Sequence, residues 1–195
     1  MNIDVESSYQ LSVDINRCHE GLEIDGDDKK FIPSLFHSTV IEHHRSIVLL
    51  VEKKLFSSAC VLLRPLFEAY VKGLWFSRCA TDKDFKELRN DKFKKTFSVL
   101  VSEIDTKSPE GSKLATPKGH YWKTLNSFTH SGAALLGRKY NQNSITNSHN
   151  KDLINSLLDF SANYALLSGI EISILAENVE AMKASMALAS SKHGL

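Results

Sequence analysis

Three charged residues recur once per helical turn inside an otherwise apolar segment. Arg64, Glu68 and Lys72 are spaced four residues apart, so a helix through them carries all three on one face. The surrounding segment, residues 57–76, is apolar almost all the way round, which is typical of a helix inside a domain. Pro65 removes a backbone hydrogen bond where the stripe begins. Burying charge costs free energy unless it is paired, so this stripe is a candidate site.

The side chains of the stripe define the chemistry it can do. An arginine can hold a phosphate with charge-assisted hydrogen bonds, and Glu68 can orient the guanidinium of Arg64 or act as a general base. The alternative is an ion pair between the two residues that lines a solvated groove, because many such pairs are surface pairs. The stripe alone leaves both interpretations open.

A second candidate group lies in residues 125–132. Asn126 and His130 are four residues apart, so both face one side of a helix that we predict over residues 120–139. Histidine can transfer protons near neutral pH, and an amide can orient a phosphate. The alternative is a core histidine that is hydrogen-bonded across the helices, with Gly132 allowing close packing.

The adjacent histidines His43 and His44 are a third candidate. Neighbouring side chains of a helix point about 100° apart, so these two rings are not expected to chelate a metal together. We expect them on a solvated helix edge. The chain also lacks the HExxH, Walker, GxGxxG, GxSxG and CxxC motifs, and we predict no metal and no cofactor.

Composition is that of an ordinary globular protein. The 195 residues are 42% hydrophobic and 24% charged, with no obvious linker, so we predict one domain over residues 1–195 with a core from about 33 to 178. The net charge of +1 gives no support for a strongly basic nucleic-acid binder, although it is compatible with a local basic cleft.

Three features of the chain bear on its location. The three cysteines follow no CxxC spacing, which favours reduced thiols. The first residues are acidic and polar, unlike a signal peptide. No run of about 18 apolar residues is free of charge. We therefore expect a cytoplasmic protein that does not enter a membrane.

Helical spacing dominates the whole chain, and no segment alternates with period two for long enough to suggest a sheet. We predict an all-α bundle of about six helices with a long C-terminal helix. Ser34, Ser57 or Ser58, and Thr81 with Asp82 are the expected starting caps, and a break near Gly169 is expected in the last helix. The predicted helices cover residues 3–22, 34–54, 57–79, 82–105, 120–139 and 151–192, with loops at 106–119 and 141–150.

The two candidate groups together resemble a known pattern. Residues 62–69 read Leu-Leu-Arg-Pro-Leu-Phe-Glu-Ala, and residues 125–132 read Leu-Asn-Ser-Phe-Thr-His-Ser-Gly. This combination resembles uncharacterised bacterial all-helical proteins with a Leu-Leu-Arg-x-x-x-Glu helix and a later helix that ends in a histidine motif. Those proteins are similar to the HEPN superfamily (higher eukaryotes and prokaryotes nucleotide-binding).

The HEPN resemblance implies a helical bundle, a homodimer and, often, a metal-independent ribonuclease toxin in phage defence or a toxin–antitoxin pair. Its catalytic motif is an arginine, a polar residue, three further residues and a histidine. Asn126 and His130 match the last two positions, whereas Leu125 stands at the arginine position. Either Arg64 or Arg138 then supplies the positive charge from elsewhere, or the chain does not cleave RNA.

Two functions follow from these observations. In the first, the chain is a HEPN-like effector in which His130 is the general acid/base, Asn126 an orienting donor, and Arg64 a phosphate clamp oriented by Glu68. Its partners are RNA or a nucleotide, and a cognate antitoxin or defence partner. In the second, the chain is a non-catalytic dimeric binding or antitoxin-like module, and Arg64, Glu68 and His130 form a polar network that fixes helix register. The first function requires Arg64 and His130 to meet across a cleft.

Overall fold

The computed structural model describes residues 5–24, 26–107, 114–137, 139–141, 144–145 and 150–193. Over these residues the chain is an all-α bundle, which confirms the predicted fold class. It has nine helices there, more than the expected six or so, because some of the predicted helices are split. The elements are α1 (Val5–His19), α2 (Asp28–Glu52), α3 (Phe56–Arg78), α4 (Asp82–Arg89), α5 (Phe97–Lys107), α6 (Ala115–Thr129), α7 (Ala133–Leu136), β1 (Tyr140–Asn141), β2 (Ser144–Ile145), α8 (Lys151–Leu175) and α9 (Val179–His193).

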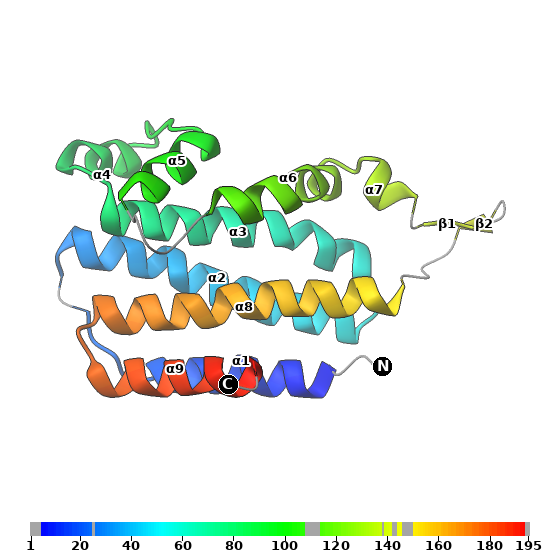
Figure 1. Cartoon of the computed structure of the whole chain (residues 1–195), viewed down its shortest axis with the longest axis horizontal. Helices are drawn as coiled ribbons and strands as arrows, with labels where there is room; N and C mark the ends of the chain where they lie inside the picture. Colours follow the sequence, from blue (N-terminus) through cyan, green and yellow to red (C-terminus); the bar gives the residue numbers. More distant parts are fainter. Residues whose placement is uncertain are drawn as a thin grey trace.

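The three longest helices, α2, α3 and α8, lie side by side at the centre of the bundle (Figure 1). α1 and α9 cover one side of this centre, and α5 and α6 pack against α3 on the other side. The centre is filled by large apolar side chains of α3, among them Phe67, Leu74 and Trp75, which are almost fully buried. Burial of each such side chain contributes roughly 2 kcal/mol to folding. α3 is therefore the central helix of the bundle.

α2 begins six residues earlier than we expected from Ser34. The carboxylate of Asp27 accepts a hydrogen bond from the backbone N–H of Lys29 and caps the helix. Pro33 therefore lies inside α2, in its second turn. The expected cap, Ser34, is buried and its hydroxyl donates to the carbonyl of Phe31.

α3 begins at Phe56, and its cap position is Leu55, which makes no side-chain hydrogen bond. The expectation that Ser57 or Ser58 caps this helix was therefore wrong. α3 continues through Pro65 to Arg78. The carbonyl of Val61 has no N–H donor at Pro65, because proline lacks one.

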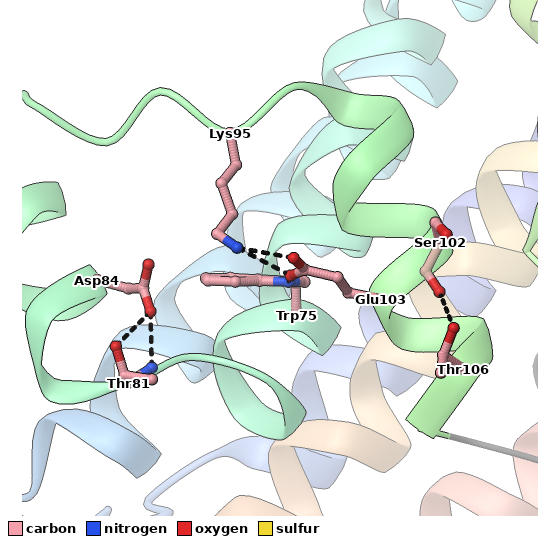
Figure 2. Close-up of polar contacts among 7 residues, drawn as sticks. All are labelled: Trp75, Thr81, Asp84, Lys95, Ser102, Glu103 and Thr106. Carbon is pink, nitrogen blue, oxygen red and sulfur yellow. Dashed lines mark hydrogen bonds and ion pairs between the residues drawn. The ribbon is translucent and has the colours of Figure 1, made fainter.

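The predicted helix over 82–105 is two helices joined by residues 90–96. Its start was predicted correctly: the carboxylate of Asp84 accepts from both the backbone N–H and the hydroxyl of Thr81 (Figure 2). α4 then ends at Arg89, and Asp91 adopts a left-handed conformation with φ of 54°. α5 packs on α3 as a helix of its own. Phe97, at its start, and Lys95, just before it, lie at the site described below.

α6 begins at Ala115 rather than at His120, because a carboxylate from another helix caps it. The two oxygens of Asp105, in α5, accept from the backbone N–H groups of Leu114 and Ala115 at 2.9 Å each. Parts of both predicted loops, residues 108–113 and most of 141–150, lie outside the described residues.

The C-terminal segment is a helical hairpin, and its break comes later than expected. α8 runs straight through Gly169 and ends at Leu175. Glu177 takes a left-handed φ of 52°, and the side chain of Asn178 accepts from the N–H of Ala181 to start α9. Gly169 instead provides room for packing, since a Cβ there would lie 2.9 Å from the ring of His19.

Candidate functional site

The charged stripe of α3 lines a pocket on the outer side of that helix. Arg64, Glu68 and Lys72 are half-buried, while residues between them face the core. The pocket has a volume of about 400 Å³. Its other walls come from the start of α5, from the segment before it and from α6; these residues are Lys95, Thr96, Phe97, Ser98, Leu100 and Trp122.

The guanidinium of Arg64 is fixed by three groups. Its Nε donates to Oε1 of Glu68 at 2.8 Å, one turn further along α3. Its Nη1 donates to Nε2 of His130 at 2.8 Å, from the end of α6. The ring of Trp122 lies 5.2 Å from the guanidinium carbon, close enough for a cation–π contact. The structure therefore brings together three of the four predicted site residues, Arg64, Glu68 and His130.

The contact with arginine defines the state of the histidine ring. A guanidinium only donates hydrogen bonds, so Nε2 of His130 accepts. The proton of a neutral ring then lies on Nδ1, and the lone pair of Nε2 is directed at Arg64. In this arrangement Nε2, the ring nitrogen that a base needs, is bonded to Arg64, which lines the pocket.

His130 is positioned by the sharp turn that ends α6. It is the cap residue of that helix, and its N–H donates to the carbonyl of Asn126 at 3.0 Å. Ser131 follows with a left-handed φ of 51°, and the N–H of Gly132 donates to the carbonyl of Ser127 at 2.7 Å. A Cβ at Gly132 would lie 2.6 Å from the hydroxyl of Ser127, so this turn requires glycine and leaves the His130 side chain exposed.

Leu125, which stands where the resemblance would place an arginine, is a core residue. Its side chain is only 3% exposed and belongs to the main core together with Phe128. A charge at this position would be buried without a partner. The positive charge beside His130 comes from Arg64 of α3, and the other sequence candidate, Arg138, lies outside the described residues.

Asn126 is not joined to the other three predicted residues. It lies one turn before His130, is half-buried, and lines a second pocket of about 740 Å³ between α5 and α6. Within the described part of the chain its side chain has no hydrogen bond to Arg64, Glu68 or His130. The two pockets share Ser98 and Trp122 as a common wall.

Trp122 is a site residue that the sequence reasoning missed. Its ring stacks on Phe97 of α5 with centroids 4.0 Å apart and planes 3° from parallel, while it also contacts Arg64. The signal was present in the sequence, because Trp122, Asn126 and His130 follow one another at intervals of four on the same helical face.

His44 has a structural role instead of the position on a solvated helix edge that we expected, whereas His43 beside it is half-buried. His44 is fully buried, and its Nδ1 lies 2.9 Å from the hydroxyl of Ser161 in α8. That hydroxyl donates to the carbonyl of Leu158, so it accepts from His44. His37, two turns earlier, repeats the arrangement with Ser168 at 3.1 Å.

Both buried rings are held neutral. Burial lowers the pKa of His37 to about 3, assisted by the charge of Arg78, and burial lowers the pKa of His44 to about 4, assisted by Lys192. Over the described residues, Nε2 of each ring has no hydrogen-bond partner. A second proton on either ring would be a buried charge without a counter-ion, so burial favours the neutral ring.

The described residues contain neither a metal-binding cluster nor a membrane-spanning helix. No group of three or more His, Cys, Asp or Glu side chains is arranged to hold a metal ion there. No helix in that part of the chain has the length and apolar character to cross a membrane.

The fold and the site together define a class of all-α protein in which an arginine from one helix meets a histidine at the end of another beside a charged pocket. The chain belongs to the family described as a family of unknown function, DUF6988, whose model matches residues 37–193. The matched residues include α3, α5 and α6, which build the site. No curated protein and no solved structure matches the chain.

Proposed function

We propose that the protein is a HEPN-like effector that cleaves RNA through the 2′-hydroxyl of its substrate. The observation that carries this proposal is the 2.8 Å contact between Nη1 of Arg64 and Nε2 of His130, at the edge of a charged pocket. It supports the hypothesis that Arg64 takes the role of the arginine that the HEPN motif would have at position 125. As the resemblance implies, such effectors act in phage defence or toxin–antitoxin pairs, often as homodimers.

The proposed reaction begins when a phosphate takes the place of His130 as the hydrogen-bond partner of Arg64. Nε2 of His130 is then free to accept the proton of the 2′-hydroxyl as a general base. The O2′–P bond forms while the P–O5′ bond breaks, and the imidazolium returns the same proton to the leaving 5′-oxygen. The products are a 2′,3′-cyclic phosphate and a free 5′-hydroxyl.

Each remaining residue of the site has a role in this reaction. The guanidinium of Arg64 stabilises the negative charge that develops on the phosphate oxygens. Glu68 and Trp122 hold that guanidinium in place, through the hydrogen bond at 2.8 Å and the ring contact at 5.2 Å. Asn126 orients the substrate from the neighbouring pocket, in which its side chain lies.

The test is to incubate the purified protein with single-stranded RNA and to identify the ends of the products. We expect 2′,3′-cyclic phosphate ends from the wild type and no products from His130→Ala. His120→Ala is the matched control, because His120 is an exposed histidine of the same helix whose ring, within the described residues, hydrogen-bonds to the carbonyl of Thr116 in α6. Intact RNA with wild-type protein at high concentration would contradict the proposal.

The second candidate function is the non-catalytic binding module. It is favoured by one observation: Nε2 of His130, the atom that catalysis requires, is already bonded to Arg64. In that case the network of Arg64, Glu68 and His130 fixes the position of α6 relative to α3. The two functions differ in how far loss of Arg64 lowers the free energy of unfolding.

A further inference from the structure

The end of the site pocket away from His130 carries its own set of donors. Lys72 lies eight residues after Arg64 on α3, which places the two about 12 Å apart along the helix. Both line the same pocket. The stripe therefore carries a cation toward each end of the pocket, with Glu68 between them.

Some of the positive side chains that line the pocket are paired with carboxylates, and one is not. Arg64 pairs with Glu68 at 2.8 Å, and Lys95 pairs with Glu103 at 2.8 and 3.1 Å. Within the described ranges, Lys72 has no carboxylate partner, although it is half-buried. A cationic side chain that lines a pocket without a counter-ion is a position where an anion would be stabilising.

Lys95 is held rigidly beside this position. Its ammonium lies 4.9 Å from the ring centroid of Trp75, while Glu103 also accepts from the indole N–H of Trp75 at 2.6 Å. Figure 2 shows the Lys95 side chain reaching from the segment before α5 to Glu103, directly over Trp75. The lysine is therefore ordered at the pocket wall before any ligand arrives.

Two further donors belong to the wall of the pocket. α5 begins there with Phe97 and Ser98, and its first turn contains no acidic residue, so its free N–H groups are not offset by a carboxylate. The hydroxyl of Ser98 accepts from Nζ of Lys118 at 2.8 Å, which leaves the proton of that hydroxyl available to a ligand.

We propose that this end of the pocket, formed by Lys72, Lys95 and Ser98, is a second anion subsite. It would bind a phosphate on the same chain as the phosphate held by Arg64. The ligand class is then a single-stranded oligonucleotide with at least two phosphates, and a mononucleotide would fill only one end. This inference rests on the proposed function and adds to it a requirement for substrate length.

The experiment measures binding by fluorescence anisotropy with two probes. One is a fluorescein-labelled 2′-O-methyluridine trinucleotide, which lacks the attacking hydroxyl and cannot be cleaved. The other is a fluorescein-labelled uridine monophosphate. The proteins are the wild type, Lys72→Gln, and the control Lys183→Gln, which removes an exposed charge on α9, a helix remote from α3 in Figure 1.

We expect Lys72→Gln to weaken trinucleotide binding about tenfold, as for loss of one charge-assisted hydrogen bond. The slope of log affinity against log salt should become shallower by about 0.7, the value for one phosphate contact on a single strand. Monophosphate binding should stay within about twofold, and Lys183→Gln should change neither affinity.

Trinucleotide binding by Lys72→Gln that equals wild-type binding would overturn the subsite. An equal loss for both probes would also overturn it, because Lys72 would then act on the Arg64 end. Failure of the wild type to bind either probe would remove both the subsite and the proposed function. Lys72-dependent binding without RNA cleavage would uphold the subsite and overturn the nuclease.

Discussion

Arg64 of α3 and His130 at the end of α6 are 66 positions apart in the sequence, yet Nη1 of one donates to Nε2 of the other at 2.8 Å. Arg64 reaches His130 while keeping its ion pair with Glu68 on its own helix. The contact places a permanent cation beside a residue that can transfer protons. It is the structural basis of the proposed activity.

The first prediction separates the two candidate functions. We expect Arg64→Gln to lower RNA cleavage at least 100-fold, as for loss of a group that stabilises transition-state charge. We expect it to lower the free energy of unfolding by less than about 1 kcal/mol, because the pair is partly exposed. Urea unfolding measures the second quantity.

The reference for this measurement is Leu66→Ala, a fully buried residue of the same helix. That variant should lose about 2–5 kcal/mol. If Arg64→Gln destabilises the protein as much as Leu66→Ala does, the polar network is structural and the non-catalytic module is the better account.

The second prediction concerns Trp122, which contacts the guanidinium of Arg64. We expect Trp122→Leu to lower kcat roughly tenfold, because an aromatic ring stabilises the cation by about 1–2 kcal/mol. Trp122→Phe keeps an aromatic face and should recover most of the rate. Steady-state kinetics on a short RNA give the comparison, and equal rates for the Phe and Leu variants would rule out this role.

The third prediction follows from the buried histidines of α2. In the unfolded chain each ring gains a proton near pH 6.5, whereas the folded rings remain neutral down to a pKa of about 4 for His44 and about 3 for His37. Because the unfolded state binds more protons in this window, the stability contribution is complete above about pH 6.5 and declines as the pH falls toward 4. Between pH 7 and pH 5 we expect a loss of about 2 kcal/mol for each ring.

Urea unfolding at several pH values tests this dependence. His44→Gln should retain only about half of the loss, since one of the two rings is gone. A free energy of unfolding that stays constant from pH 7 to pH 5 would show that the rings are not held neutral.

The fourth prediction compares two helical glycines. A Cβ at Gly73 would lie 2.7 Å from Nε2 of His37, whereas a Cβ at Gly119 would meet no atom within 4 Å. We expect Gly73→Ala to cost about 1–2 kcal/mol, because crowding exceeds the gain in helix propensity. Gly119→Ala should stabilise α6 by up to about 1 kcal/mol. Thermal unfolding of both variants checks the contrast, and similar melting temperatures would contradict it.

The sequence predicts the parts of this structure that depend on local spacing. The period of the apolar residues predicts an all-α fold, and an interval of four places Arg64 beside Glu68 on one face of α3. The same reasoning misses features that depend on distant partners. Asp105 caps α6 from another helix, and Gly169 is small because His19 packs on it.

The site shows the same division between local and distant information. Leu125 at the motif's arginine position could be read from the sequence, but its burial in the core could not. The burial of His44 could not be predicted from the sequence either. Whether a helix face is buried depends on the elements that pack on it, and these are distant in the sequence. The hydroxyl partner Ser161 lies 117 residues away, and no local pattern indicates it.

The central claim is that His130 and Arg64 together cleave RNA, and the most direct measurement is the chemistry of the RNA ends produced by matched histidine variants. We predict 2′,3′-cyclic phosphate ends from the wild type and from His120→Ala, and no cleavage by His130→Ala at equal concentration and equal folded fraction. Cleavage by His130→Ala at the wild-type rate, or intact RNA with every variant and the wild type, would contradict the account.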